Sequence, residues 1–156
     1  MEVVLEEDIK EIYATLSESL IKLQGKTVLV TGAAGFLGRY FMSLLTYSNQ
    51  ISSANPITII ALDNYITSNK PIGTNILRDD KNVEWIVGDA SIGSQLPNRF
   101  DYIIHSAGIA SPEHYRANPL LTIDVAINVT RSLLERARKD NSRMLFFSSS
   151  EIYGDP

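Results

Sequence analysis

A glycine-rich turn at residues 31–38, with the sequence Thr-Gly-Ala-Ala-Gly-Phe-Leu-Gly, limits what this chain can fold into more than any other stretch. It follows the apolar run 26–30, which predicts a buried parallel strand, and it precedes residues 39–45, whose apolar positions have helical spacing. Strand, glycine turn and helix form the setting in which the pattern Gly-x-x-Gly-x-x-Gly indicates a dinucleotide-binding site. The alternative is an ordinary strand-to-helix turn that uses its glycines for geometry only.

The three glycines of the pattern have separate physical roles in such a turn. Gly32 permits the tight bend, Gly35 lets a pyrophosphate approach the backbone, and Gly38 allows the helix to pack closely on the strand. The free N–H groups and the positive dipole end of the helix then face the phosphates. We therefore expect the turn to bind the cofactor through Gly32, Ala34, Gly35, Phe36, Leu37 and Gly38.

Composition excludes several classes of function. The chain has 156 residues, which is enough for one domain with a core, and its net charge of −4 argues against nucleic acid as the main partner. It contains no cysteine, so it can form no disulfide, thiolate zinc site or thiol nucleophile, and we expect no bound metal. No apolar run is long enough to span a bilayer, and the acidic N-terminus is no signal peptide. We therefore expect no membrane partner and a cytoplasmic location.

Residues 6–23 are predicted to form an amphipathic helix that stops at Gly25. The apolar side chains that recur at helical spacing are Ile9, Ile12, Leu16, Leu20 and Leu23. A minimal dinucleotide-binding fold needs nothing before its first strand. We therefore interpret residues 1–25 as a helical extension packed against the periphery of the sheet, with a contact in an oligomer as the alternative.

The second predicted strand, 57–62, ends at Asp63 and Asn64, which we expect to bind the cofactor. An acidic residue at this position can accept both hydroxyl groups of the adenosine ribose. Its charge would repel a 2′-phosphate, so Asp63 favours NAD over NADP. Arg39 is the one residue that could argue for NADP, and we interpret it as a surface arginine on the helix. The alternative for Asp63 is a loop carboxylate or a cap.

Residues 65–82 contain few apolar anchors, and they predict a loop with at most a short helix near Ile76 and Leu77. Loops at the carboxyl ends of parallel strands border the ligand crevice of such folds. Within this segment, Asp79 and Asp80 are interpreted as a solvated turn rather than as a paired-carboxylate site.

The third and fourth predicted strands, 83–87 and 100–104, also end in candidate cofactor-binding residues. Asp89 could receive the adenine amino group while the backbone at Ala90 meets the ring, and a turn-capping role for Asp89 is the alternative. We interpret His105, at the end of the fourth strand, as a hydrogen-bonded structural histidine rather than as an acid or base. The small residues that follow, where the chain must pass close to a cofactor, are Ser106, Ala107 and Gly108.

Strands and helices alternate along residues 26–156, which predicts a Rossmann-type α/β domain. The clearest helix spans 119–139, and the fifth strand, 143–147, runs into a polar motif at 148–156. We expect a doubly wound, three-layer sandwich around a parallel sheet of about five strands in the order 3-2-1-4-5. The free edge of the fifth strand would favour weak stability or association.

Five motifs in this order resemble the extended short-chain dehydrogenases/reductases, and among them the NAD-dependent epimerase/dehydratase family that acts on nucleotide sugars. The matching motifs are TGAAGFLG at 31–38, ALDN at 61–64, GD at 88–89, HSAG at 105–108 and SSSEIYGDP at 148–156. Together they cover essentially everything after the first helix. The resemblance implies NAD as the cofactor and a nucleotide sugar, such as a UDP-sugar, as the substrate.

Two details resemble the UDP-glucuronate decarboxylase branch of that family. Residues 111–119, SPEHYRANP, are similar to its SPxxYxxNP segment, and residues 149–151, Ser-Ser-Glu, are similar to its Thr-Ser-Glu. Sugar dehydratases prefer Thr-Asp-Glu there, so Ser150 argues mildly against dehydration, and epimerases usually lack an acid at the position of Glu151. A nucleotide-sugar 4-epimerase or 4,6-dehydratase is the alternative activity.

The resemblance also implies roles for individual residues in these two segments. Ser149 would hydrogen-bond the sugar 4-hydroxyl, Ser150 would contact the substrate beside it, and Glu151 would assist the step after oxidation. Tyr115 would line the pocket for the sugar or its carboxylate. The implied reaction oxidises C4, releases the C5 carboxylate as carbon dioxide, and reduces C4 again, so the cofactor is not consumed.

The sequence departs from the family in one respect that bears on activity. The family uses a tyrosine base whose pKa is lowered by a lysine four residues later, and no Tyr-x-x-x-Lys occurs in this chain. In the family, that pair and a substrate-binding domain follow the motif at 148–156. We therefore expect 26–156 to be an incomplete NAD-binding domain that does not turn over. The full-length protein would be a homodimer formed through the Tyr/Lys helix and the neighbouring helix 119–139. A non-catalytic dinucleotide-binding module is the alternative from another class.

Overall fold

The computed structural model describes residues 6–52, 54–67, 80–90, 96–97 and 99–154, with the backbone alone for Ser150 and Glu151. The described residues form one sheet of five parallel strands in the order β3-β2-β1-β4-β5. The strands are β1 (Thr27–Thr31), β2 (Thr58–Asp63), β3 (Val83–Val87), β4 (Tyr102–His105) and β5 (Arg143–Phe146). The predicted strand order and direction are therefore confirmed.

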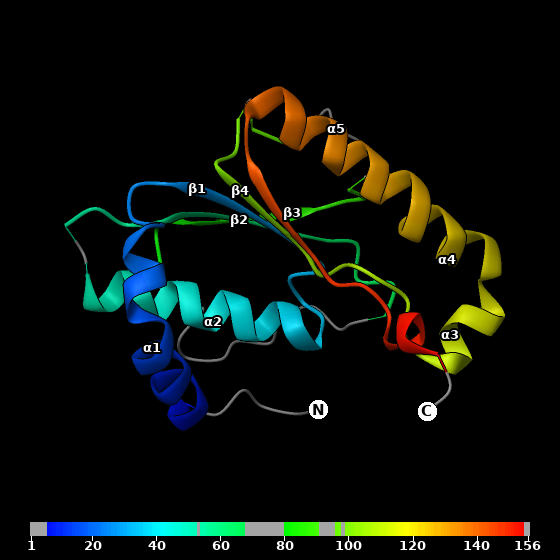
Figure 1. Cartoon of the computed structure of the whole chain (residues 1–156), viewed down its shortest axis with the longest axis horizontal. Coiled ribbons are helices and arrows are strands. Elements are labelled where there is room, and N and C mark those ends of the chain that lie inside the picture. Colours follow the sequence, from blue (N-terminus) through cyan, green and yellow to red (C-terminus); the bar gives the residue numbers. More distant parts are fainter. Residues whose placement is uncertain (1–5, 53, 68–79, 91–95, 98, 155–156) are drawn as a thin grey trace.

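Helices cover both faces of this sheet and produce the predicted three-layer sandwich (Figure 1). On one face lies α2 (Phe36–Ile51), and on the other lies α5 (Thr130–Asp140). Side chains alternate between the faces along each strand. In β1, Val28 and Val30 belong to the core under α2, whereas Leu29 belongs to the core under α5. Both faces are apolar because both are covered, as is usual for parallel sheets.

The N-terminal helix α1 (Glu6–Ile21) packs mainly on α2, and not on the sheet periphery as predicted. Its Ile9 is fully buried in the core under α2. The Tyr40 hydroxyl of α2 donates a hydrogen bond to Asp8 at 3.0 Å, and the rings of Tyr13 and Tyr47 meet edge to face with centroids 5.2 Å apart. The extension thus covers the aromatic outer side of α2.

The predicted helix 119–139 is instead a succession of helical segments. It comprises α4 (Pro119–Asp124), a π-helical segment η2 (Val125–Val129) and α5. A short helix that the sequence analysis did not predict, α3 (Pro112–Ala117), precedes it, and a 3-10 turn, η3 (Ser150–Tyr153), follows β5. The apolar periodicity over 119–139 indicates a helix, but it does not reveal where the backbone hydrogen-bonding changes. π-helical turns of this kind occur frequently at functional sites.

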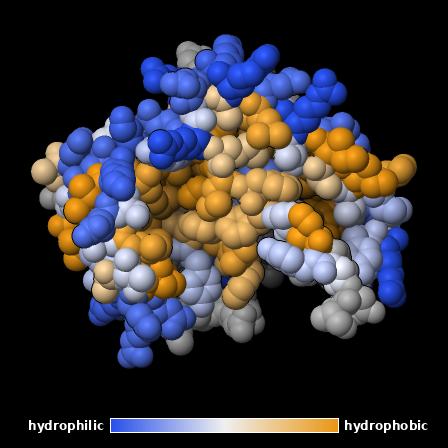
Figure 2. Space-filling view, in the orientation of Figure 1, coloured by the Kyte–Doolittle hydropathy of each residue, from blue (hydrophilic) through white to orange (hydrophobic). Residues whose placement is uncertain are grey.

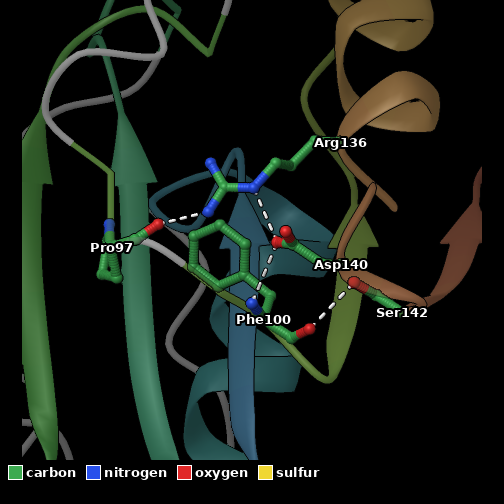
Figure 3. A network of polar contacts seen from close by, with 5 residues as sticks. All are labelled: Pro97, Phe100, Arg136, Asp140 and Ser142. Atoms are coloured by element: carbon green, nitrogen blue, oxygen red, sulfur yellow. Dashed lines mark hydrogen bonds and ion pairs between the residues drawn. The ribbon is translucent and has the colours of Figure 1, made fainter. Parts of the chain in front are cut away.

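A polar network fixes α5 on the start of β4 (Figure 3). Asp140 Oδ2 accepts hydrogen bonds from Arg136 Nε at 2.6 Å and from the Phe100 N–H at 3.1 Å. The Arg136 guanidinium also donates to the Pro97 carbonyl and lies 4.8 Å from the centroid of the Phe100 ring. Ser142 Oγ donates to the Phe100 carbonyl at 2.8 Å. Because this end of α5 is held, the helix segments that precede it extend toward the carboxyl ends of the strands.

Two predictions concern the segment between β2 and β3. Ile76, Leu77 and Asp79 lie outside the described residues. Asp80 is half-buried, and its carboxylate accepts hydrogen bonds from Asn49 Nδ2 at 2.9 Å and from the Asn82 N–H at 2.9 Å. It therefore caps the turn before β3: the turn predicted at Asp80 is confirmed, but its carboxylate is bound by neighbouring residues rather than solvated. None of the described helices is long and apolar enough to cross a lipid bilayer.

Candidate functional site

A groove lies along the carboxyl ends of the strands, where β1 separates β2 on one side from β4 on the other. The register places Thr31 of β1 beside Leu62 of β2 and His105 of β4, so these three strands end at the same level. Two adjoining pockets form the groove, and they share Gly32, Asp63, Asn64, Ala107 and Val125. Such a crevice, at the point where the strand order reverses, is where open α/β sheets bind ligands.

Most of the predicted cofactor-binding residues meet in this groove. Those that line it are Gly32, Gly35, Asp63, Asn64, Asp89, Ala90, Ser106, Ala107 and Gly108. Ala34, Phe36, Leu37 and Gly38 are not among its lining residues. Ala34 and Gly38 are buried within the turn, whereas Phe36 and Leu37 are exposed in the first turn of α2.

The three glycines differ in what a side chain at each position would contact. Gly32 has φ +68°, and a Cβ built on it would lie 2.6 Å from the Ala107 nitrogen. A Cβ on Gly38 would lie 2.0 Å from the Gly32 carbonyl oxygen. Both positions exclude a side chain because of the protein itself, in line with their predicted geometric roles.

Gly35 differs from the other two glycines. It is the N-cap residue of α2, and it makes no side-chain hydrogen bond to the helix. Its backbone is extended, with φ −70° and ψ 177°, a conformation that any residue adopts. Among the described residues that are not its chain neighbours, a Cβ on Gly35 would meet only the Gly32 carbonyl oxygen within 4 Å, at a tight 3.1 Å. Gly35 lines the groove. The missing side chain therefore keeps the groove open in front of the N-terminus of α2, where unpaired N–H groups and the helix dipole favour an anion.

Asp63 fastens the glycine turn to β2. This buried carboxylate accepts the Ala34 N–H at Oδ2, 2.9 Å away, and the Tyr65 N–H at Oδ1, 2.7 Å away. Asp63 is thus a cap, as the alternative interpretation held, and it also lines both pockets of the groove. Tyr65 has φ +57°, and partial burial together with the charge of Asp63 raises the pKa of its phenol.

Arg39 is not the surface arginine that the sequence predicted. Its side chain is half-buried and turns back along α2, so that Nε donates a hydrogen bond to the Ala34 carbonyl at 3.0 Å. Helical periodicity places Arg39 near the surface but cannot show this return to the preceding turn. The residue therefore belongs to the structure of the glycine turn, and sequence reasoning missed it.

His105 is a buried structural residue, which confirms its interpretation from the sequence. Its Nδ1 lies 2.7 Å from Thr31 Oγ1, and its Nε2 lies 3.1 Å from Thr130 Oγ1. The ring also stacks on Phe146, with centroids 5.7 Å apart. Burial lowers the pKa of His105 below 6.5 and favours the neutral ring. His105 thereby joins β1, β4 and the start of α5 beneath the groove.

The pocket beside β3 has apolar walls and, besides Asp63, a second carboxylate. Asp89 and Ala90 lie there with Leu62, and η2 contributes Val125 and Val129. The two valines were not predicted as site residues, because in the sequence they are indistinguishable from the other apolar positions of the helix. A planar apolar group with a hydrogen-bond donor at its edge would fit such walls.

The residues predicted to face the sugar lie elsewhere. Ser149 is exposed at the end of the chain segment that follows β5, and Tyr115 is partly exposed on α3. Neither lines the groove. The side chains of Ser150 and Glu151 lie outside the described residues.

Residues 28–156 match the NAD dependent epimerase/dehydratase family. Over 136 residues the chain is 33% identical to UDP-glucuronic acid decarboxylase 2 of Arabidopsis thaliana, an alignment that covers 87% of this chain and 28% of that protein. This similarity supports the resemblance to the decarboxylase branch noted at residues 111–119 and 149–151.

Among the solved structures that share the fold are two epimerases. The epimerase Mth375 from Methanothermobacter thermautotrophicus superimposes with a TM-score of 0.69 and 26% identity, over 88% of this chain and 39% of that one. UDP-glucose 4-epimerase from Bifidobacterium longum, solved with NAD+ and UDP, gives a TM-score of 0.61 and 27% identity, over 83% of this chain and 39% of that one. The chain thus spans well under half the length of the proteins it resembles. From the family match and the shared fold, the chain belongs to the NAD dependent epimerase/dehydratase family.

Proposed function

We propose that the groove binds NAD and that the chain is the cofactor-binding part of a nucleotide-sugar enzyme of the UDP-glucuronate decarboxylase type. The observation that carries the proposal is Gly35, whose missing side chain opens the groove although its backbone conformation does not require glycine. A Cβ on Gly35 would make a tight 3.1 Å contact with the Gly32 carbonyl oxygen, whereas a Cβ on Gly38 would clash at 2.0 Å and one on Gly32 at 2.6 Å, so the geometry of the turn demands glycine less strongly at position 35. The B. longum epimerase, which shares the fold, was solved with NAD+.

In this proposal the pyrophosphate lies against Gly35 and the first turn of α2. Phe36 and Leu37 begin the helix, so their N–H groups lack acceptors within it. Their exposed side chains point away from the core, and we assign them a backbone role toward the phosphates. Ser106, Ala107 and Gly108 form the opposite wall of the groove. Apart from its chain neighbours, no atom of the described residues lies within 4 Å of a Cβ built on Gly108, so it too leaves space in front of β4.

The adenosine would occupy the part of the groove between β2 and β3. Asp63 already accepts two backbone N–H groups, but an ionised carboxylate offers about four acceptor positions. Because Asp63 lines both pockets of the groove, its carboxylate is placed to accept the ribose hydroxyls, and its negative charge disfavours a 2′-phosphate, so NAD is preferred to NADP. Asn64 lies beside the ribose, and Asp89 and Ala90 meet the adenine between the apolar walls.

The chemistry of the whole protein is proposed from the decarboxylase branch. NAD, when bound, supplies reversible hydride transfer at the sugar C4. The hydroxyl of Ser149 would bind the 4-hydroxyl of a UDP-sugar, Ser150 and Tyr115 would contact the substrate, and Glu151 would act near C5. A 4-epimerase or 4,6-dehydratase is the second candidate, favoured by the two epimerases that share the fold.

Residues 1–156 alone are expected to bind NAD without turning over. The family base is a tyrosine with a lysine four residues later, and no such pair occurs in these residues. Incubation with NAD and UDP-glucuronate should therefore release no carbon dioxide and accumulate no NADH. Sustained release of carbon dioxide would overturn this part of the proposal, and a non-catalytic dinucleotide-binding module would be supported if a longer chain were equally inactive.

We further propose that the whole protein forms a homodimer through the side of α4, η2 and α5 that faces away from the sheet. Large apolar residues are exposed along it at Leu120, Ile123, Ile127 and Leu134. Figure 2 shows apolar surface both on this side of the molecule and across its middle, where β5 runs in Figure 1. Ile127→Asp should convert a dimer of the whole protein to a monomer in sedimentation analysis. A dimer unchanged by the substitution would contradict this interface.

The binding proposal is tested by calorimetric titration of the chain with NAD and with NADP. Saturable binding of NAD, with NADP weaker, is the expected result. Absence of NAD binding to the folded chain would overturn the proposed function.

A further inference from the structure

The peptide groups on both sides of Ala34 are held by two oppositely charged side chains. The Ala34 N–H donates to Asp63 Oδ2 at 2.9 Å, and the Ala34 carbonyl accepts from Arg39 Nε at 3.0 Å. Asp63 comes from the end of β2, whereas Arg39 comes from the first turn of α2. Ala34 is itself fully buried and lies directly before Gly35. Two elements that flank the groove thus converge on one residue of the turn.

Hydrogen bonds define the shape of this turn because its side chains are too small to do so. The N–H groups of Gly32 and Ala33 both donate to the Leu62 carbonyl, at 2.9 and 3.3 Å, and the Gly35 N–H donates to the Gly32 carbonyl at 3.0 Å. The peptide between Ala34 and Gly35 is therefore fixed at its N–H by the turn and at its carbonyl by Arg39. Without Arg39, only the Gly35 N–H would hold this peptide, and any rotation that turned its carbonyl toward the groove would bring a partial negative charge against a diphosphate.

We propose that Arg39 is a positioning residue of the dinucleotide site, which it serves by holding the Ala34 carbonyl away from the pyrophosphate. The inference rests on the proposed function of the groove. Arg39 is not among the residues that line the groove, so its effect passes through the turn. The hydrogen bond to the Ala34 carbonyl holds the guanidinium charge beside Gly35, the N-cap residue of α2. There the charge adds to the positive potential of the helix N-terminus.

This assignment differs from the role that an arginine near such a turn has in NADP recognition. A ligand of the 2′-phosphate needs its guanidinium free for the phosphate, and an Arg39 of that kind would matter for NADP alone. The bond from Nε to Ala34 acts on the turn instead. Arg39 should therefore matter equally for NAD and NADP, and it should not matter for adenosine, which has no phosphate.

The test compares Arg39→Gln, Arg39→Lys and the wild-type chain, with Arg138→Gln as a matched control. Arg138 is exposed on α5 and also carries one positive charge. Titrations with NAD, NADP and adenosine are combined with thermal unfolding of each variant. For Arg39→Gln we expect affinity for NAD and NADP to fall by the same factor, about tenfold, with adenosine binding unchanged. Arg39→Lys, which keeps a donor and the charge, should recover part of the loss, and Arg138→Gln should bind like the wild type.

The remaining outcomes contradict different parts of the proposal. Equal NAD affinity of wild type and folded Arg39→Gln overturns the positioning role alone, and a loss limited to NADP makes Arg39 a phosphate ligand instead. A parallel loss of adenosine binding reduces Arg39 to a general structural role. If Arg39→Gln does not fold, Arg39→Lys decides by the same comparison of NAD with adenosine. If the wild-type chain binds no NAD, the proposed function and this inference both fall.

Discussion

The carboxylate of Asp63, at the end of β2, binds the backbone of Ala34 in the glycine turn that follows β1, with Oδ2 2.9 Å from the Ala34 nitrogen. Asp63 and Ala34 are 29 residues apart in the sequence. This bond makes the residue proposed to select the cofactor a part of the turn proposed to bind it. A substitution at Asp63 should therefore change both stability and cofactor preference.

Asp63→Asn should lower the free energy of unfolding and also reduce the preference for NAD. An amide offers one acceptor oxygen in place of two, so either Ala34 or Tyr65 faces an NH2 group, at a cost of about 1–3 kcal/mol. Loss of the negative charge should raise the affinity for NADP relative to NAD. Urea denaturation and paired titrations measure the two effects.

Asp80→Asn is the matched control for this change. Asp80 also accepts several hydrogen bonds from neighbouring residues, but it lies before β3, away from the groove. The Asp80→Asn chain should be less stable than the wild type, but its ratio of NAD to NADP affinity should not change. An Asp63→Asn chain that keeps the wild-type ratio would contradict the role assigned to the carboxylate.

Gly38→Ala should destabilise the fold, whereas Gly108→Ala should not. A Cβ on Gly38 would lie 2.0 Å from the Gly32 carbonyl oxygen, a backbone atom that cannot move without deforming the turn. Overpacking of this kind costs about 3 kcal/mol or more. A Cβ built on Gly108 has no atom of the described part of the chain within 4 Å, its two chain neighbours aside. Denaturation midpoints of the two variants measure the difference, and equal midpoints would argue against the packing described for the turn.

Protonation of His105 should destabilise the protein in mild acid. Burial places the folded-state pKa below the value of 6.5 for the unfolded chain, so the unfolded state binds the proton more tightly. The contribution to stability is complete above pH 6.5 and is lost as the pH falls from there toward the folded-state pKa. Unfolding free energies measured across this range should fall less steeply in His105→Gln than in the wild type.

The chain has only two histidines, which supplies a control for the acid effect. His114 lies on α3, so the His114→Gln chain removes the other imidazole and shows how much of the slope belongs to His105. If His114→Gln flattens the slope and His105→Gln does not, the assignment of the titrating group is wrong.

Asp140→Ala should cost about 3–5 kcal/mol, because it leaves the half-buried Arg136 without its ion-pair partner and the buried Phe100 N–H without its acceptor. The side chains of Arg136 and Asp140 are only 19% and 4% exposed. The pair Arg131–Glu135 has the same spacing on the same helix, but its side chains are 78% and 61% exposed. Glu135→Ala should therefore change stability by less than about 1 kcal/mol. Chemical denaturation distinguishes the two, and similar losses would contradict the account of the network.

The strand order and the place of the groove were predictable because each depends on a local pattern. Apolar runs of four to six residues mark the strands, and the residues at their carboxyl ends meet at one edge once the sheet is parallel. The glycine pattern adds the N-terminus of α2 to that edge. Gly32, Asp63 and Ala107 could therefore be grouped from the sequence alone.

The features that were missed depend on contacts between distant segments. The apolar stripe of α1 indicates that the helix is covered, but it does not say that Tyr13 finds Tyr47 on α2 rather than the sheet. The π-helical hydrogen bonding of η2 is a backbone feature that apolar periodicity does not record. The return of Arg39 to Ala34 is a choice of side-chain rotamer, and a sequence pattern holds no information on it.

Titration of NAD into the wild-type chain and into Gly35→Val tests most directly whether the glycine turn binds the pyrophosphate of the cofactor. The extended backbone of Gly35 accepts valine, and the Cβ requires the Gly32 carbonyl, 3.1 Å away, to shift by a few tenths of an ångström, so circular dichroism and denaturation first verify that the variant is folded. Its branched side chain would occupy the place of the pyrophosphate, and NAD affinity should fall by at least about tenfold. Equal NAD affinity of the two folded chains would contradict this binding role, because the glycine turn would then serve only the geometry of the fold.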